Sequence, residues 1–149
     1  MTMTQSATSF FEEVRVVYAE TAAAAGLTGP TETERILPVS RYKGGGVEYA
    51  VSLDVREGAV ECDVSFTTDA LSFTVDIEPL AIAAGIVDKR GGISYSARNL
   101  KQLHKSLLDQ AYYVRRVHPL LTADAATTED LMRRARAREW HRHRSTPSR

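Results

Sequence analysis

Five acidic side chains in the middle of the chain could act together on one cation or one basic partner. They occupy polar positions in three stretches where apolar and polar residues alternate: Asp54, Glu61, Asp63, Asp76 and Glu78. Successive side chains of a β-strand point to opposite faces of the sheet. We therefore expect all five carboxylates on the exposed polar face of one antiparallel sheet, with the apolar residues facing a core.

The positions of the turns predict which carboxylates face each other. The three stretches are Val47–Arg56, Ala59–Thr68 and Leu71–Glu78, and two-residue turns at Glu57-Gly58 and Asp69-Ala70 would connect them. This register predicts two rows across the sheet, Asp54 with Glu61 and Glu78, and Ser52 with Asp63 and Asp76. Like charges opposed across strands destabilise a sheet, so these rows need compensation from solvent, a cation or a basic partner.

The carboxylates have three interpretations: a solvated outer face, a recognition surface or a metal site. Hard cations also need carbonyl ligands and a shaped loop, which this pattern does not supply. Asp63 and Asp76 could share a proton in acid–base catalysis, but an open sheet has no walls to desolvate them. The chain also lacks the motifs of nucleophilic, zinc-dependent and dinucleotide-dependent enzymes. We therefore expect a non-enzymatic protein with no metal and no cofactor.

A second group of residues with binding chemistry lies near the C-terminus. Arginines and a tryptophan are interleaved there: Arg133, Arg134, Arg136, Arg138, Trp140 and Arg142. Arginine with aromatic residues suits phosphate contacts and base stacking, so this segment is an alternative basic site for nucleic acid. The residues from Thr127 to Asp130 resemble a capping box and predict that the segment is helical. A solvated or protein-contacting helix and a membrane-surface helix are the other interpretations.

The rest of the sequence predicts helices before and after the meander. Apolar residues at helical spacing indicate helices over 10–25 and 96–119, and a shorter helix spans 79–85. Pro38 cannot donate to a ladder, so we expect Arg35–Tyr42 to be an edge strand. Residues 86–95 could form two short strands. The fold class is therefore α+β, an antiparallel β-meander of four or more strands with helices packed on one face.

Length and composition favour one cytoplasmic domain. The chain has 149 residues, of which 43% are hydrophobic and 26% charged, as is ordinary for a globular protein. The single cysteine, Cys62, excludes an internal disulfide and suits a reducing compartment. We find no secretory signal and no apolar run long enough to span a membrane. We expect a single domain over 1–149, with residues 1–8 and 145–149 frayed.

The formal net charge is zero, but the charges are unevenly distributed along the chain. Residues 1–95 contain 7 Lys and Arg against 14 Asp and Glu, whereas residues 96–149 contain 12 against 5. Such asymmetry predicts an electrostatic partner or contact between the two halves. The sequence leaves open whether the basic C-terminal segment covers the acidic sheet face.

A leading helix, a meander with an acidic face and helices ending in an arginine-rich tail resemble the small bacterial immunity proteins of polymorphic toxin systems. The residues that carry this likeness are Asp54, Glu61, Asp63, Asp76 and Glu78. The resemblance implies a cytoplasmic, non-enzymatic protein that neutralises a toxin by binding it. We expect a basic protein partner such as a toxin, and no membrane partner. A nucleic-acid-binding protein and a secretion-chaperone-like dimer are the alternative functions, and the oligomeric state stays open.

Overall fold

Alternating burial along the central strands defines which side of the meander faces the core. The computed structural model describes residues 3–142, and every second side chain of β3 (Val47–Asp54) is buried. β4 (Ala59–Thr67) has the same alternation, with its apolar residues on the buried side. β5 (Leu71–Asp76) pairs with β4, and both pairings are antiparallel. The predicted centre of the sheet is therefore confirmed.

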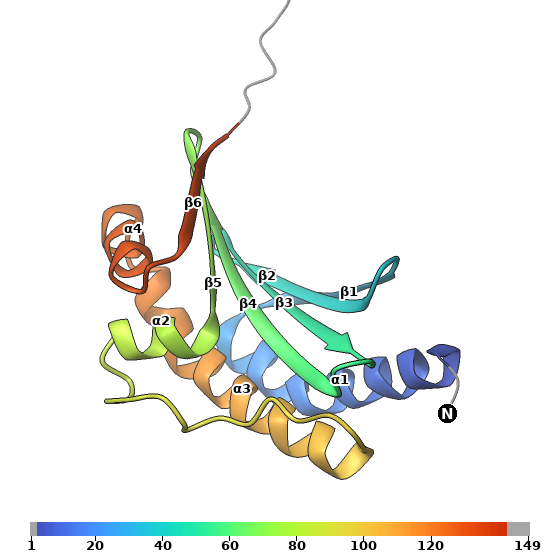
Figure 1. Cartoon of the computed structure of the whole chain (residues 1–149). Coiled ribbons are helices and arrows are strands. Elements are labelled where there is room, and N and C mark those ends of the chain that lie inside the picture. Colours follow the sequence, from blue (N-terminus) through green and yellow to red (C-terminus); the bar gives the residue numbers. More distant parts are fainter. Residues whose placement is uncertain (1–2, 143–149) are drawn as a thin grey trace, which may run out of the picture.

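Three further strands and four helices complete the fold. The antiparallel sheet has the order β1-β2-β3-β4-β5-β6, with β1 at Thr28–Glu34, β2 at Pro38–Gly44 and β6 at Arg138–His141. The helices are α1 (Met3–Ala25), α2 (Ile77–Ala83), α3 (Leu100–Leu121) and α4 (Ala125–Arg134). All four helices lie on one side of the sheet, and no described segment covers the other side (Figure 1). The predicted α+β class is confirmed.

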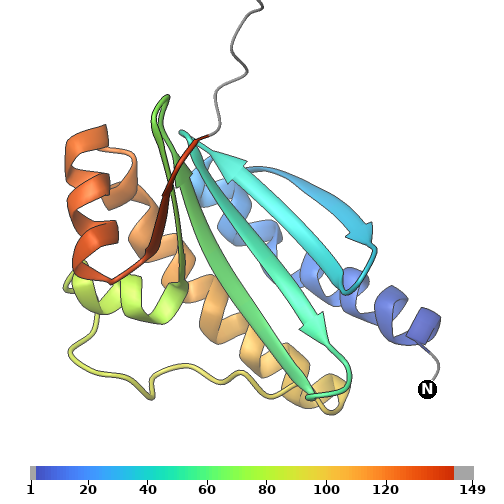
Figure 2. The same cartoon turned by 45° about the horizontal axis from the view of Figure 1, so that its top comes forward.

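α1 and α3 lie side by side beneath the sheet and run in the same direction (Figure 2). Ion pairs join Glu13 to His104 and Glu20 to Arg115, so corresponding turns of the two helices are aligned. α2 packs against α3, and α4 packs against α2, α3 and β5. The helical layer therefore contacts the sheet from β1 to β5.

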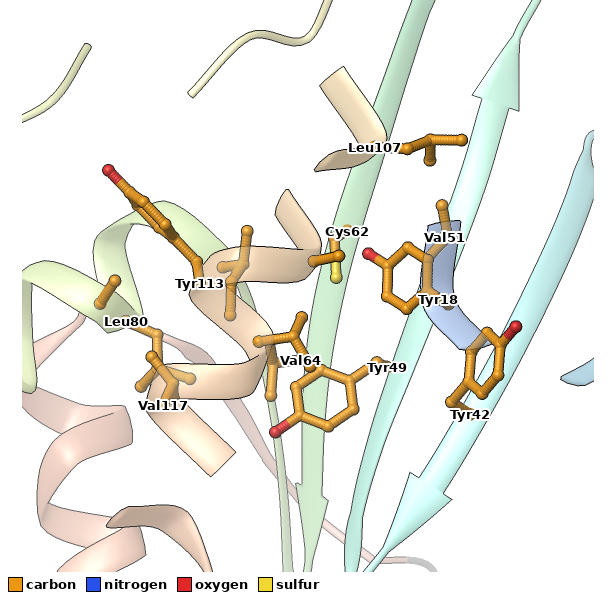
Figure 3. Close-up of a cluster of buried hydrophobic side chains, with 14 of the residues drawn as sticks. Tyr18, Tyr42, Tyr49, Val51, Cys62, Val64, Leu80, Leu107, Tyr113 and Val117 are labelled. Atoms are coloured by element: carbon orange, nitrogen blue, oxygen red, sulfur yellow. The ribbon is translucent and has the colours of Figure 1, made fainter. Parts of the chain in front are cut away.

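The hydrophobic core lies between the helices and the sheet (Figure 3). Tyr18 of α1 stacks on Tyr42 of β2, with ring centroids 5.2 Å apart, and both rings are buried. The Tyr18 hydroxyl points toward Cys62 of β4 in Figure 3. Burial raises the pKa of the Cys62 thiol well above its ordinary value, so the thiol stays neutral. Cys62 is therefore a buried core residue, as its phase in the strand predicts.

The first edge of the sheet differs from the sequence-based prediction. We predicted that Arg35–Tyr42 is the edge strand, but β1 pairs outside β2, and β2 begins at Pro38. Pro38 stands at the first position of its strand, where the missing N–H matters least. Thr28–Glu34 carries no alternation of apolar residues, because none of its side chains is fully buried. The sequence of an exposed edge strand therefore resembles that of a loop.

Residues 86–95 form no pair of short strands, contrary to the prediction. The segment instead runs along β4 where β5 has ended, and Val60 N–H donates to the Tyr95 carbonyl at 2.8 Å. A single bridge between Ala59 and Ser96 extends this contact. The chain therefore uses an irregular segment to pair with the exposed part of β4.

The start and end of α3 also differ from the predicted range 96–119. The helix begins at Leu100, because the Asn99 side chain caps it by accepting a hydrogen bond from Gln102 N–H at 2.9 Å. The helix continues through Pro119 to Leu121. Pro119 lies in the last turn, where one missing backbone donor does not end the helix.

The C-terminal segment shows the largest departure from the prediction. α4 is capped by Asp124, whose carboxylate accepts from Thr127 N–H at 2.8 Å, and it ends at Arg134. Arg136 then adopts a positive φ of 61°, and the chain reverses into β6. The helix that we predicted over the arginine-rich segment is therefore confirmed as far as Arg134 and is wrong from Arg136 onward.

The chain ends were predicted to be frayed over residues 1–8 and 145–149. α1 already begins at Met3, within the first of these stretches, and Ala7 is buried in the helical layer. The second stretch lies outside the described residues.

Candidate functional site

The uncovered face of β3, β4 and β5 brings together the carboxylates that the sequence singles out. Asp63 of β4 pairs directly with Asp76 of β5, as predicted. Glu61 lies two residues before Asp63 on the same face and pairs with Ser52 of β3. The predicted pairing of Asp63 with Asp76 is therefore confirmed, and Glu61 shares their face. We call Asp54, Glu61, Asp63 and Asp76 the acidic face.

The pairing of β3 with β4 is shifted by two residues from the predicted register. Asp54 pairs with Ala59 and not with Glu61, because the turn has four residues, Val55 to Gly58, and not two. Asp54 stabilises this turn by accepting a hydrogen bond from Glu57 N–H at 3.1 Å. A shift of two residues keeps each side chain on its predicted face. Asp54 and Glu61 therefore still share the acidic face.

Glu78 does not lie on the exposed face, so this part of the prediction is wrong. The chain leaves the sheet at Ile77, where α2 begins, and the Asp76 carboxylate caps the helix by accepting from Glu78 N–H at 3.3 Å. Glu78 is 3% exposed and accepts from Gly91 N–H at 2.8 Å. Its carboxylate holds the segment after α2 in place and cannot reach a partner.

Asp76 connects the acidic face with the interior. The Tyr95 hydroxyl donates to Asp76 Oδ2 at 2.5 Å and lies 3.3 Å from Glu78 Oε1. The other oxygen, Asp76 Oδ1, is buried and has no hydrogen-bond partner among the described residues. Burial raises the pKa of Asp76 above its ordinary value, and the hydrogen bond from Tyr95 offsets part of this rise.

Two further carboxylates of this face, Glu61 and Asp63, also have raised pKa values. Burial raises the pKa of Asp63, and the charge of Asp76 raises it further. Burial raises the pKa of Glu61 as well, with added repulsion from Asp63, Asp76 and Asp54. A raised carboxyl pKa means that folding makes the ionised form less favourable. The fold therefore keeps these carboxylates together at an electrostatic cost.

β6 places part of the basic segment on the same face as the carboxylates. Arg138 pairs with Thr74 and Trp140 pairs with Ser72, so both side chains share the outer face of β5. Arg138 lies over the Trp140 ring at 5.3 Å, and its charge lowers the pKa of Asp63 in part. The basic segment therefore extends the sheet beside the acidic face and does not cover it.

The remaining arginines of the segment do not form one surface. Arg133 and Arg134 lie on α4 and pair with Glu139 at 3.1 Å and Asp130 at 3.2 Å. Arg136 lies between α4 and β6, and Arg142 donates to the Thr68 carbonyl at 3.1 Å. The predicted alternative basic site is therefore divided over three elements.

A small hollow of about 110 Å³ opens on the uncovered face beside the β3–β4 turn. Its lining combines three carboxylates with a hydroxyl and two apolar side chains: Leu37, Ser52, Asp54, Glu57, Ala59 and Glu61. Sites for drug-sized ligands span about 300–1,000 Å³, so this hollow suits a single side chain of a partner. The sequence pattern missed Leu37 and Glu57 here, because both lie in connections and not in strands.

No metal centre stands out on this face. Within residues 3–142, no group of three His, Cys, Asp or Glu side chains has the arrangement needed to hold a metal ion. None of the helices in that range has the length and apolar character needed to cross a lipid bilayer.

His118 and Tyr49 form a buried pair of titratable groups outside the acidic face. Tyr49 is fully buried, His118 is 5% exposed, and the Tyr49 hydroxyl lies 2.7 Å from His118 Nδ1. Burial lowers the pKa of His118 below its ordinary value. The pair lies on the core side of the sheet, away from the acidic face, so it serves the packing of α3 on β3.

Acidification is expected to reduce the contribution of His118 to stability. The unfolded chain binds a proton near the ordinary histidine pKa of about 6.5, whereas the folded chain resists it, so stability falls as the pH drops below that value. The loss is at most about 1.4 kcal/mol per pH unit. Urea unfolding of the wild type and of His118→Gln from neutral to acidic pH measures this difference. A difference that stays constant over that range would contradict the assignment.

Comparison with known proteins adds no relative. A scan of protein-family models, a search of curated protein sequences and a search of solved structures each return no match to this chain.

Proposed function

We propose that the protein is a non-enzymatic inhibitor, an immunity protein that binds a basic bacterial toxin through its acidic face. One observation carries the proposal: Glu61, Asp63 and Asp76 lie together on an uncovered sheet face, and each has a raised pKa. A cationic partner would stabilise the ionised carboxylates and offset their mutual repulsion. Asp76 contributes to folding as the cap of α2, but its repulsion with Glu61 and Asp63 opposes folding.

The chemistry of the face suits a partner that itself binds a polyanion. A toxin that cleaves nucleic acid carries a basic cleft, and clustered carboxylates match such a cleft in charge and accelerate association. The hollow beside the β3–β4 turn would take one lysine or arginine of the partner, with Asp54, Glu57 and Glu61 around its charged end.

Apolar residues border the acidic face on both sides, as protein interfaces require. Trp140 on β6 is 42% exposed, and Ile36 in the β1–β2 turn is 92% exposed. Tryptophan and arginine are frequent centres of binding energy, and Trp140 carries Arg138 over its ring. Trp140 and Ile36 could therefore supply apolar contacts to a partner that binds the acidic face.

Nucleic-acid binding by the arginine segment is the weaker alternative. Arg133 and Arg134 are paired with acidic side chains, and Arg138 lies near Asp63, so little free positive charge is directed at one ligand. Carboxylates beside Arg138 would repel a phosphate backbone.

Reversing two charges of the acidic face is expected to weaken toxin binding. Glu61→Lys with Asp63→Lys should raise the Kd for the toxin encoded by a neighbouring gene about 30- to 100-fold, which corresponds to about 2–3 kcal/mol. Isothermal titration calorimetry of the purified pair measures the change. Growth of cells that express the toxin together with each variant gives the functional readout.

The control makes the same change in net charge away from the sheet. Asp88→Lys with Asp130→Lys alters two exposed carboxylates, one in the α2–α3 connection and one on α4, and should leave the Kd within about threefold. Equal losses in both double variants would mean that net charge alone matters and would overturn the proposed face. Binding of DNA or RNA at low salt, without toxin binding, would favour the alternative.

A further inference from the structure

The exposed apolar side chains of α3 lie on one inclined ridge that winds around the helix, with Leu108 and Tyr112 at its middle. They recur at multiples of four residues: Leu100, Leu108, Tyr112 and Leu120, which are 52, 48, 55 and 39% exposed. Residues spaced by four form one ridge on a helix surface, and such a ridge packs into the groove of another helix. His104 and Arg116 fill the two other positions of this ridge.

α1 carries a matching exposed ridge beside it. Val16 is 69% exposed, and Glu12 and Glu20 stand four residues before and after it. The ion pairs Glu13–His104 and Glu20–Arg115 align the helices, which places Val16 level with Leu108. The apolar patch therefore continues from α3 onto α1.

Both helices lie on one side of the sheet (Figure 1). The buried residues of α1 and α3 pack toward the sheet, so the surface formed by the exposed ridges lies on the opposite side of these helices from the sheet. No described segment of the chain covers it, since the side chains of both ridges are exposed. Apolar side chains that gather on one exposed face are a feature of interaction sites. The surface is also separate from the acidic face, so it does not belong to the site proposed above.

The charges on the two ridges identify the partner. On α1 the order is acidic, apolar, acidic, at Glu12, Val16 and Glu20; on α3 the apolar Leu108 and Tyr112 lie between His104 and Arg116. Glu20 and His104 also form ion pairs within the chain, so a second copy would extend these pairs across the interface. Consider a two-fold axis that runs parallel to α1 and α3 and lies between the helical layers of the two copies. This axis would place α1 of each copy on α3 of the other. Acidic side chains would then meet basic ones in both contacts, as a self-complementary interface requires.

We propose that a second copy of this chain covers the α1–α3 surface and forms a two-fold symmetric dimer. Each contact packs Leu108 and Tyr112 of one copy against Val16 of its partner, with the charged residues of the ridges on either side. The acidic faces of the two copies then point outward in opposite directions, so one dimer presents two binding surfaces.

The oligomeric state in solution tests this dimer. Sedimentation velocity of the full chain should give twice the chain mass, and Leu108→Glu should reduce it to the chain mass. Ile36→Glu is the matched control, because Ile36 is more exposed than Leu108 but lies in the β1–β2 turn. A wild-type monomer up to the solubility limit, or a dimer unaffected by Leu108→Glu, would overturn the proposal.

Charge exchange tests the pairing of the ridges directly. One copy with Glu12→Lys and Glu20→Lys, and another with His104→Glu and Arg116→Glu, should each be monomeric alone and form a heterodimer when mixed. Circular dichroism of each variant verifies that it is folded before mixing. Folded variants that dimerise alone, or that fail to associate when mixed, would reject the arrangement of α1 on α3.

Discussion

Gln110→Glu is expected to lower the free energy of unfolding by about 3–5 kcal/mol at neutral pH, because it buries a charge without a donor. Gln110 is fully buried, and its Nε2 donates to the carbonyls of Val60 at 3.0 Å and Ser94 at 3.1 Å. These bonds attach the segment after α2 to β4. A carboxylate in this position would face two acceptors and could donate to neither.

The pH dependence separates a buried charge from a simple loss of packing. The site raises the pKa of the introduced carboxyl, so the folded variant binds a proton more readily than the unfolded chain. The deficit should therefore shrink as the pH falls toward the ordinary glutamate pKa of about 4.3. Urea unfolding at several pH values measures this change, and a deficit independent of pH would contradict the explanation.

Gln102→Glu on the same helix provides the control. Gln102 is partly exposed in the first turn of α3 and accepts from Arg98 N–H at 3.0 Å through Oε1. The carboxylate keeps this acceptor and adds negative charge near the helix N-terminus, where it is favourable by about 0.3–1 kcal/mol. Gln110→Glu should thus lower the free energy of unfolding, whereas Gln102→Glu should raise it slightly.

Phe73→Ala is expected to lower the free energy of unfolding by about 3–5 kcal/mol. Phe73 is fully buried on the core side of β5, with Phe66 of β4 at 6.4 Å between ring centroids and Arg133 of α4 over its ring at 5.4 Å. The substitution leaves a cavity where β4, β5 and α4 meet. Thermal and urea unfolding measure the loss.

Amide exchange locates the effect of this cavity. β6 pairs with β5 alone, so weaker packing under β5 should speed exchange in α4 and β6 more than in α1 and β2. Ile36→Ala is the control, because its side chain is 92% exposed, and it should change stability by no more than about 0.5 kcal/mol. A loss spread evenly over the chain would contradict a role of Phe73 in holding the C-terminal elements.

The central strands are predictable because each has one buried face and one exposed face. That periodicity specifies the faces of Glu61 and Asp63 even though the β3–β4 turn is longer than predicted. A slip of two residues preserves the face of every side chain. The pairing of Asp63 with Asp76 also follows from sequence, because the turn at Asp69-Ala70 is short.

β6 is not predictable from local sequence, since its arginine and glutamate and the alanines just before it favour a helix. All four of its residues are exposed, and it forms a strand because the edge of β5 offers a ladder to pair with. The prediction for Glu78 is wrong because apolar and polar residues alternate up to that position. The capping aspartate Asp76 and Pro79 in the first turn signal the start of α2 and could have placed Glu78 correctly.

Because the ribosome makes the chain from the N-terminus, the late position of β6 in the sequence affects the protein during its synthesis. β5 emerges well before Arg138–His141, so its outer ladder of N–H and C=O groups has no partner until β6 has been made. Translation at about 5–20 residues per second leaves that edge unpaired for several seconds. During this interval another nascent strand could add to β5, and shortening the chain before Arg138 would make that vulnerability permanent.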